Sequence, residues 1–157
     1  MGTSHARAYR RMSDDVKIVG LVSRGETSRE QLNADLGGGF AEFNDFATAL
    51  AETNPHIVCI STYSETHAEY AIAALTAGAH VFLEKPVADN IADCERVIDT
   101  ARRLKRALVV GYILNVHPSW QKFTELARTL GTPLVMRMNL NQQSSGSQWA
   151  THKQLLR

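Results

Sequence analysis

The chain has 157 residues, of which 44% are hydrophobic and 21% are charged, a composition that is ordinary for one globular domain. Its 17 Lys and Arg residues balance 16 Asp and Glu residues, so no basic field would attract nucleic acid or an anionic membrane. No apolar run approaches the roughly 20 residues that span a bilayer, and residues 1–11 lack the apolar centre of a secretory signal. We therefore expect a cytoplasmic protein. Cys59 and Cys94 have neither a disulfide framework nor metal-site spacing, so no metal is expected.

Short apolar runs alternate with helical patterns along most of the chain. Strands are expected where aliphatic and β-branched residues cluster, at 17–23, 40–43, 56–62, 79–84 and 107–112. Helices are expected at 27–36, 45–53, 65–77, 91–105 and 118–130. Thr27 or Ser28 is the expected cap of the first helix, and Asn44 or Asp45 of the second. Strands that are apolar on both faces and separated by helices predict a doubly wound α/β fold with a parallel sheet.

The pattern changes after residues 131–133. Residues 134–140 alternate apolar and polar side chains, as a strand with one solvated face does. Residues 141–148 are polar and rich in Gly and Ser, and a helix is expected to begin in 149–157. We therefore predict a first domain over 1–131 and the start of a second, α+β domain over 132–157.

Polar side chains follow four of the predicted strands, at the edge where ligands bind to an open parallel sheet. These are Ser23 and Arg24, then Thr62, Tyr63 and Ser64, then Glu84, Lys85 and Pro86, then residues 112–117. A dinucleotide lying across this edge would meet all four sets. Pro86 favours an extended backbone at Lys85 and so directs the lysine outward, where a dry or cationic site would let it exchange a proton. From these residues alone, an exposed ion pair beside a turn is the alternative.

Three stretches resemble the Gfo/Idh/MocA family, the relatives of glucose–fructose oxidoreductase and inositol dehydrogenase. They are 62–69 (TYSETHAE), 73–81 (AALTAGAHV) and 84–86 (EKP). Gly111-Tyr112, His117-Pro118 and the polar tail 142–149 extend the resemblance over essentially the whole chain. The resemblance implies an oxidoreductase that transfers a hydride between NAD(P) and a hydroxyl-bearing carbon of a sugar, polyol or related compound. It also implies that the full-length protein is a homo-oligomer.

The resemblance also implies roles for single residues. Lys85 is the expected catalytic residue, which contacts the reacting hydroxyl and assists proton transfer, and Glu84 lies by the nicotinamide ribose. His67 lies close to the cofactor edge, with helix capping or packing as the alternative. The expected cofactor-binding set is Gly2, Thr3, Ser23, Arg24, Thr62, Tyr63, Ser64, His67, Glu84, Lys85 and Pro86.

Substrate contacts are expected from residues beyond the last parallel strand. Asn115, His117 and Trp149 are the candidates besides Lys85, with capping of the next helix as the alternative for the first two and packing for Trp149. The family's catalytic aspartate and histidine would lie beyond residue 157.

The sequence begins Met1-Gly2-Thr3-Ser4-His5-Ala6, which looks like the end of a G-x-G-x-x-G fingerprint with Gly2 as its third glycine. We therefore expect a Rossmann-like sheet that lacks its first strand, which would lie between 17–23 and 56–62 in the order 3-2-1-4-5-6. Either the two flanking strands keep unpaired inward edges, or they pair directly with each other. We expect the isolated chain to bind dinucleotide weakly or not at all.

In this fold, an acidic residue about 20 residues past the fingerprint binds the ribose 2′-hydroxyl of NAD. This sequence carries Ser23-Arg24 at that position in place of an acid. A hydroxyl and a guanidinium suit a 2′-phosphate, which favours NADP over NAD. Glu26 could substitute for the acid, and Arg24 could stack on adenine, so NAD stays open. Two other functions compete with this one. The first is a non-catalytic NAD(P)-binding regulatory module, which would not need a proton-transfer lysine such as Lys85. The second is an inactive fragment.

Overall fold

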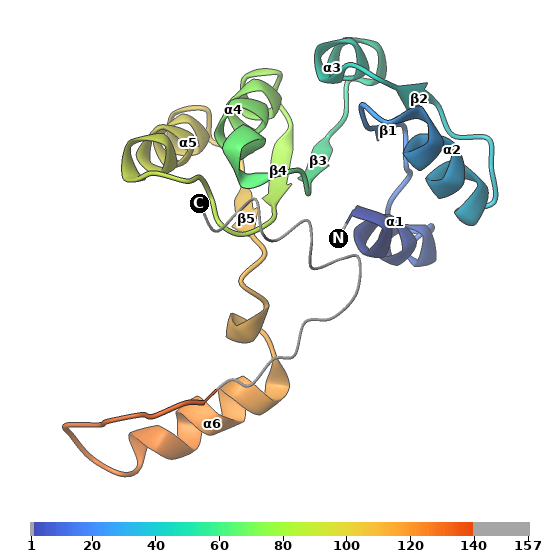
Figure 1. Ribbon diagram of the computed structural model, residues 1–157. Helices are drawn as coiled ribbons and strands as arrows, with labels where there is room; N and C mark the ends of the chain where they lie inside the picture. Colours follow the sequence, from blue (N-terminus) through green and yellow to red (C-terminus); the bar gives the residue numbers. More distant parts are fainter. Residues whose placement is uncertain (1, 140–157) are drawn as a thin grey trace. The chain divides into compact units, whose positions relative to one another are not determined.

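The structure, a computed structural model, describes residues 2–139, in which helices and strands alternate along the sequence (Figure 1). The helices are α1 (Gly2–Arg11), α2 (Glu26–Asp35), α3 (Phe46–Thr53), α4 (His67–Thr76), α5 (Ile91–Arg103) and α6 (Pro118–Arg128), with short 3-10 turns at Ser64–Thr66 and Ile113–Asn115. The strands are β1 (Leu21–Val22), β2 (Glu42–Phe43), β3 (Ile57–Ile60), β4 (His80–Leu83) and β5 (Leu108–Val110). Each strand is shorter than the apolar run that predicted it, because only part of each run has a paired neighbour.

The strands form two parallel sheets, one of β1 and β2 and one in the order β3-β4-β5. The second sheet is in register across Val58, Val81 and Leu108. This order agrees with places 3-2 and 4-5-6 of the predicted arrangement, so the doubly wound α/β prediction is confirmed. Within the described residues β1 and β3 do not pair, so the alternative in which they pair directly is wrong.

The hydrophobic core surrounds β4, which is the middle strand of its sheet. Val81 and Leu83 of β4 are buried, and Leu75 of α4 and Val97 of α5 pack with them. Buried alanines along α4 let this helix lie close to both β4 and α5 (Figure 1). Burying each large side chain contributes roughly 1.5–3 kcal/mol, so this sheet and its two helices hold most of the stabilising apolar contacts.

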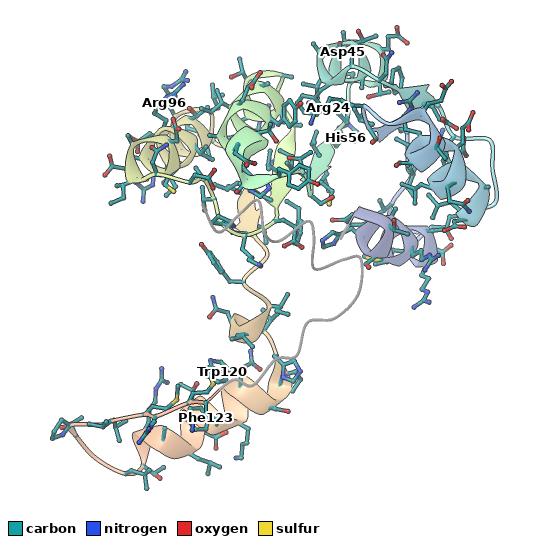
Figure 2. The ribbon with its side chains drawn as sticks, viewed as in Figure 1. Arg24, Asp45, His56, Arg96, Trp120 and Phe123 are labelled. Atoms are coloured by element: carbon teal, nitrogen blue, oxygen red, sulfur yellow. The ribbon has the colours of Figure 1, made fainter. Side chains whose placement is uncertain are left out.

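The helix ends follow local backbone chemistry. Asp45, labelled in Figure 2, caps α3 as predicted, since its carboxylate accepts from the Thr48 backbone N–H at 2.7 Å. The predicted cap of α2 is wrong: the extended residue Gly25 takes that position without a side-chain bond, and the helix begins at Glu26, ahead of Thr27 and Ser28. The helix stops before three glycines with positive φ, residues 37–39, as expected.

The chain divides into two compact units, Met1–Ile113 and Leu114–Arg157. In the second unit, Trp120 and Phe123 of α6 lie with their ring centroids 5.3 Å apart (Figure 2). The strand predicted from residue 134 is wrong over 134–139, because alternation without a neighbouring strand leaves the backbone unpaired. Residue 140 and the helix expected in 149–157 lie outside the described residues. The domain boundary near residue 131 therefore stays a prediction.

The described helices include none that is long and apolar enough to cross a membrane. Residues 2–139 also contain no group of three or more His, Cys, Asp or Glu side chains that could hold a metal ion.

Candidate functional site

The candidate site lies where β4 ends. Leu83 is fully buried, and the next residue, Glu84, is still only 6% exposed. Lys85 and Pro86 follow at once and are exposed. A buried carboxylate and an exposed lysine therefore follow each other at the carboxyl end of β4. Ligands of open parallel sheets bind at this edge.

Three elements enclose the Glu84 carboxylate. His5 of α1 donates from Nε2 to Oε1 at 2.7 Å. The Lys85 backbone N–H donates to Oε2 at 3.3 Å. Gly111 follows β5, and a Cβ at this position would lie 3.3 Å from Oε2, so the missing side chain leaves room for the carboxylate. The site therefore depends on residues that are far apart in the sequence.

The electrostatics of this enclosure favour the charged form of Glu84. Burial raises the pKa of Glu84, but the hydrogen bond from His5, the Lys85 backbone N–H and the charges of both residues outweigh it and lower the pKa below its ordinary value. Glu84 is therefore an anion at neutral pH. It places a fixed negative charge one residue before Lys85.

The loop after β3 reaches the same edge. Thr62 and Tyr63 are exposed, and Ser64 is half-buried. The hydroxyl of Thr66 donates to Tyr63 O at 2.9 Å and pairs with the Thr62 hydroxyl at 2.8 Å, which closes the turn. His67 lies beneath this loop, only 1% exposed, and its ring contacts the Thr62 and Pro86 carbonyls. The structure therefore brings the predicted residues after β3 and β4 together.

Helix α1 packs its first turn against the end of β3. A Cβ on Gly2 would lie 2.9 Å from Ser61 Oγ, so a larger residue would have to displace the Ser61 hydroxyl. Thr3 is exposed in the same turn.

Burial raises the pKa of Cys59 to about 11 and that of Tyr9 to about 12, so both groups stay neutral and neither is an activated nucleophile.

Ser23 and Arg24 follow β1. The Ser23 backbone N–H donates to Phe43 O at 3.1 Å, and its carbonyl accepts from the Arg29 guanidinium. Arg29 is half-buried and lies 3.8 Å from the Glu42 carboxylate, whereas Arg24 is exposed. Within the described residues, the hydrogen bonds of this loop run to β2 and α2, and none reaches the loops after β3 and β4.

The candidate substrate residues Asn115 and His117 belong to the second unit. Both are exposed. His117 occupies the N-cap position of α6 but makes no side-chain cap bond, and Asn115 uses its backbone carbonyl to accept from Gln121 Nε2 at 3.2 Å. The capping alternative is therefore met by His117 through its backbone alone, and it is wrong for Asn115. Trp149 lies outside the described residues.

Sequence reasoning missed His5 and Arg29. His5 lies 79 positions from its partner Glu84, and no local pattern indicates such a contact. The available signal was its place one turn after Gly2, on the helix that follows the predicted fingerprint. Arg29 lies within the predicted helix 27–36, and no local pattern indicates that it donates to the Ser23 carbonyl.

A family model described as an oxidoreductase family with an NAD-binding Rossmann fold matches residues 1–112. The chain belongs to this family, Gfo/Idh/MocA. The resemblance seen in the sequence is thereby confirmed. As a member of the family, the chain carries an NAD-binding Rossmann fold over the residues that contain the candidate site.

Curated relatives in this family are dehydrogenases. The chain is 31% identical over 148 residues to 4-carboxy-2-hydroxymuconate-6-semialdehyde dehydrogenase of Sphingobium sp., covering 88% of the chain and 47% of the relative. It is 29% identical to inositol 2-dehydrogenase 3 of Saccharopolyspora erythraea, covering 86% and 40%. The chain thus spans less than half the length of these relatives.

Solved structures agree in fold. UDP-N-acetylglucosamine 3-dehydrogenase from Acidithiobacillus ferrooxidans matches with a TM-score of 0.68 at 26% identity, over 80% of this chain and 39% of that one. Myo-inositol 2-dehydrogenase from Lactobacillus plantarum matches with a TM-score of 0.75 at 19% identity, over 82% and 38%, which is a likeness of fold alone.

Proposed function

We propose that the full-length protein is an NAD(P)-dependent oxidoreductase acting on a hydroxyl-bearing carbon of a sugar, polyol or related compound. The observation that carries this proposal is the strand end at which exposed Lys85 follows buried, ionised Glu84. In the oxidation, a bound nicotinamide would take the hydride from the substrate carbon, and Lys85 in its neutral amine form would take the O–H proton and become the ammonium, which leaves a carbonyl. The name of the inositol 2-dehydrogenase relative supports this reaction class, and that of the semialdehyde dehydrogenase supports an oxidoreductase.

The residues at the edge suit a dinucleotide. Gly2 brings the first turn of α1 close to Ser61, and such a helix N-terminus offers free N–H groups to phosphate. Thr3 adds a hydroxyl there, while Thr62 and Ser64 offer hydroxyls along the loop after β3. When bound, the cofactor supplies the hydride acceptor or donor; the chain supplies binding groups and the proton-handling lysine.

Replacing Lys85 tests the activity. The full-length protein is assayed with inositols and sugars in the presence of NAD or NADP, and reduced nicotinamide is followed by its absorbance. Lys85→Met should lower kcat by roughly 100-fold or more, because a positioned acid–base group contributes about that factor. Lys17→Met, an exposed lysine ahead of β1, is the matched control and should keep kcat. Dinucleotide binding without turnover of any substrate would instead indicate a regulatory module.

We propose that NADP is preferred to NAD, with Ser23 and Arg24 at the 2′-phosphate. Support comes from the exposed Arg24 guanidinium and from the absence of an acid at these two positions. Arg24→Ala should weaken NADPH binding roughly 10-fold or more, the equivalent of one lost charge-assisted hydrogen bond, and leave NADH binding nearly unchanged. Arg96→Ala on α5, also labelled in Figure 2, is the control. Equal losses for the two dinucleotides would contradict the NADP assignment.

We further propose that the full-length protein is a cytoplasmic homo-oligomer. The resemblance to the Gfo/Idh/MocA family, which implies a homo-oligomer, supports the oligomeric state. Light scattering of the full-length protein tests it, and a monomer mass would contradict it.

A further inference from the structure

His67 is the most deeply buried polar side chain at the candidate site. It is the first residue of α4, and only 1% of its surface is exposed. Nδ1 contacts the carbonyl oxygen of Pro86 at 2.6 Å, and Nε2 contacts that of Thr62 at 3.1 Å. Its ring therefore faces the backbone of both loops that carry the predicted cofactor and catalytic residues.

The two contacts have a definite donor chemistry. A carbonyl oxygen only accepts, so each bond forms when the facing ring nitrogen carries a proton. The imidazole ring is rigid and presents nitrogens on different edges, which lets one side chain reach two separate loops. A ring with a single N–H donates to one of these carbonyls and only contacts the other. A glutamine carries both of its N–H groups on one nitrogen, and a phenylalanine carries none.

Few other side chains hold these loops to each other. The Thr62–Tyr63 turn is closed by Thr66, which belongs to the same segment. Lys85 is bonded through its backbone N–H to its own neighbour, Glu84. Among residues 2–139, His67 is the residue whose side chain forms hydrogen bonds between the loop after β3 and the Lys85–Pro86 segment.

We propose that His67 is a positioning residue. Its ring links the loop after β3 to the Lys85–Pro86 segment and so fixes Lys85 relative to the edge of the sheet where the cofactor is expected to bind. It replaces the direct cofactor contact that the family resemblance implied, because its ring is enclosed and both nitrogens face backbone carbonyls. The kinetic consequence rests on the proposed oxidoreductase function. Misplacing a reacting group by about an ångström costs roughly 100-fold in rate, so loss of the His67 ring contacts should act mainly on kcat.

His80 provides a matched internal control. It begins β4, at the strand end opposite to Lys85, and its Nδ1 accepts from the Ala107 backbone N–H at 2.9 Å. Like His67, it joins two backbone segments through its ring. It differs in lying at the edge of the sheet away from the candidate site.

The kinetic experiment uses the full-length protein with its best substrate and cofactor. His67→Gln should lower kcat by roughly 10- to 100-fold, with a much smaller change in the KM of the hydroxyl substrate, and His67→Phe should lower kcat further. His80→Gln should reduce thermal stability and keep kcat. The proposal is overturned if folded His67→Gln retains kcat, or if His80→Gln loses as much kcat as His67→Gln.

A measurement on the unsubstituted protein covers the case in which the variants do not fold. With 15N-labelled histidine, the ring N–H of His67 that donates to a loop carbonyl should give a slowly exchanging resonance, and this resonance should persist in His80→Gln. Rapid exchange of the His67 ring proton would overturn the proposal. If the full-length protein turns over no hydroxyl compound, the proposed function fails, and the ring resonance still decides whether His67 joins the loops.

Discussion

Glu84 shows how a buried charge is tolerated at the end of a strand. An ionised carboxylate taken out of water costs several kcal/mol unless it is paired and hydrogen-bonded. His5 and the Lys85 backbone N–H supply those bonds, and Gly111 leaves the space. Because the net effect lowers the pKa of Glu84, its contribution to stability is fully present above the ordinary glutamate pKa and is lost as the pH falls through the folded-state value.

Removing His5 should expose this dependence. His5→Ala leaves the carboxylate short of a donor and should lower the free energy of unfolding at neutral pH by about 1–3 kcal/mol. The difference in free energy of unfolding from the unsubstituted protein should narrow in acid, where Glu84 is protonated and no longer carries a buried charge. Urea unfolding at a series of pH values measures both effects.

Arg7→Ala is the control for His5→Ala, since Arg7 lies on the same helix and pairs with Asp35 at the surface. Its effect should be much smaller, because exposed ion pairs contribute little. A His5→Ala difference that stayed constant from neutral to acid pH would show that the pair does not depend on the charge of Glu84.

At the scale of the element, side-chain periodicity located the helices well and the strands less well. Helix α5 runs over Ile91–Arg103, inside the predicted 91–105, because a long amphipathic stripe has a clear start and end. Strands are defined by their partners, and an apolar run does not say how many of its residues are paired. For the same reason the alternating residues 134–139 form no strand.

The start of α5 offers a direct test of local stabilisation. The Asn90 side chain accepts from the Asp93 backbone N–H at 2.9 Å and caps the helix. Asn90→Ala should lower the free energy of unfolding by about 1 kcal/mol, while Asn90→Ser, which can still accept that bond, should cost much less. Thermal unfolding compares the two. Equal destabilisation would mean that the cap bond contributes nothing.

At the scale of the whole molecule, the sequence located the edge of the candidate site but not its internal contacts. Lys85 could be placed because a proline follows a buried strand, and both features are local. The bond between His5 and Glu84 could not, because it depends on how α1 packs against a distant strand end. The partners of the His67 ring were equally hidden, since backbone carbonyls carry no sequence signature.

The two sheets should differ in local stability, and hydrogen exchange on the 157-residue chain should reveal it. Strand β4 is paired on both sides, and Val81 and Leu83 lie in the core. The ladder between β1 and β2 spans two residue pairs, and Val22 is exposed. Amides of β4 should therefore exchange only through the largest opening, whereas those of β1 and β2 should exchange through smaller, local openings. Raising the urea concentration should lower the free energy of opening for the β4 amides steeply, as it does for global unfolding. It should change the free energy of opening for the β1 and β2 amides little. Equal protection of both sheets would mean that the chain unfolds as one cooperative unit, held by contacts of α1 with both Glu84 and the Leu36 carbonyl.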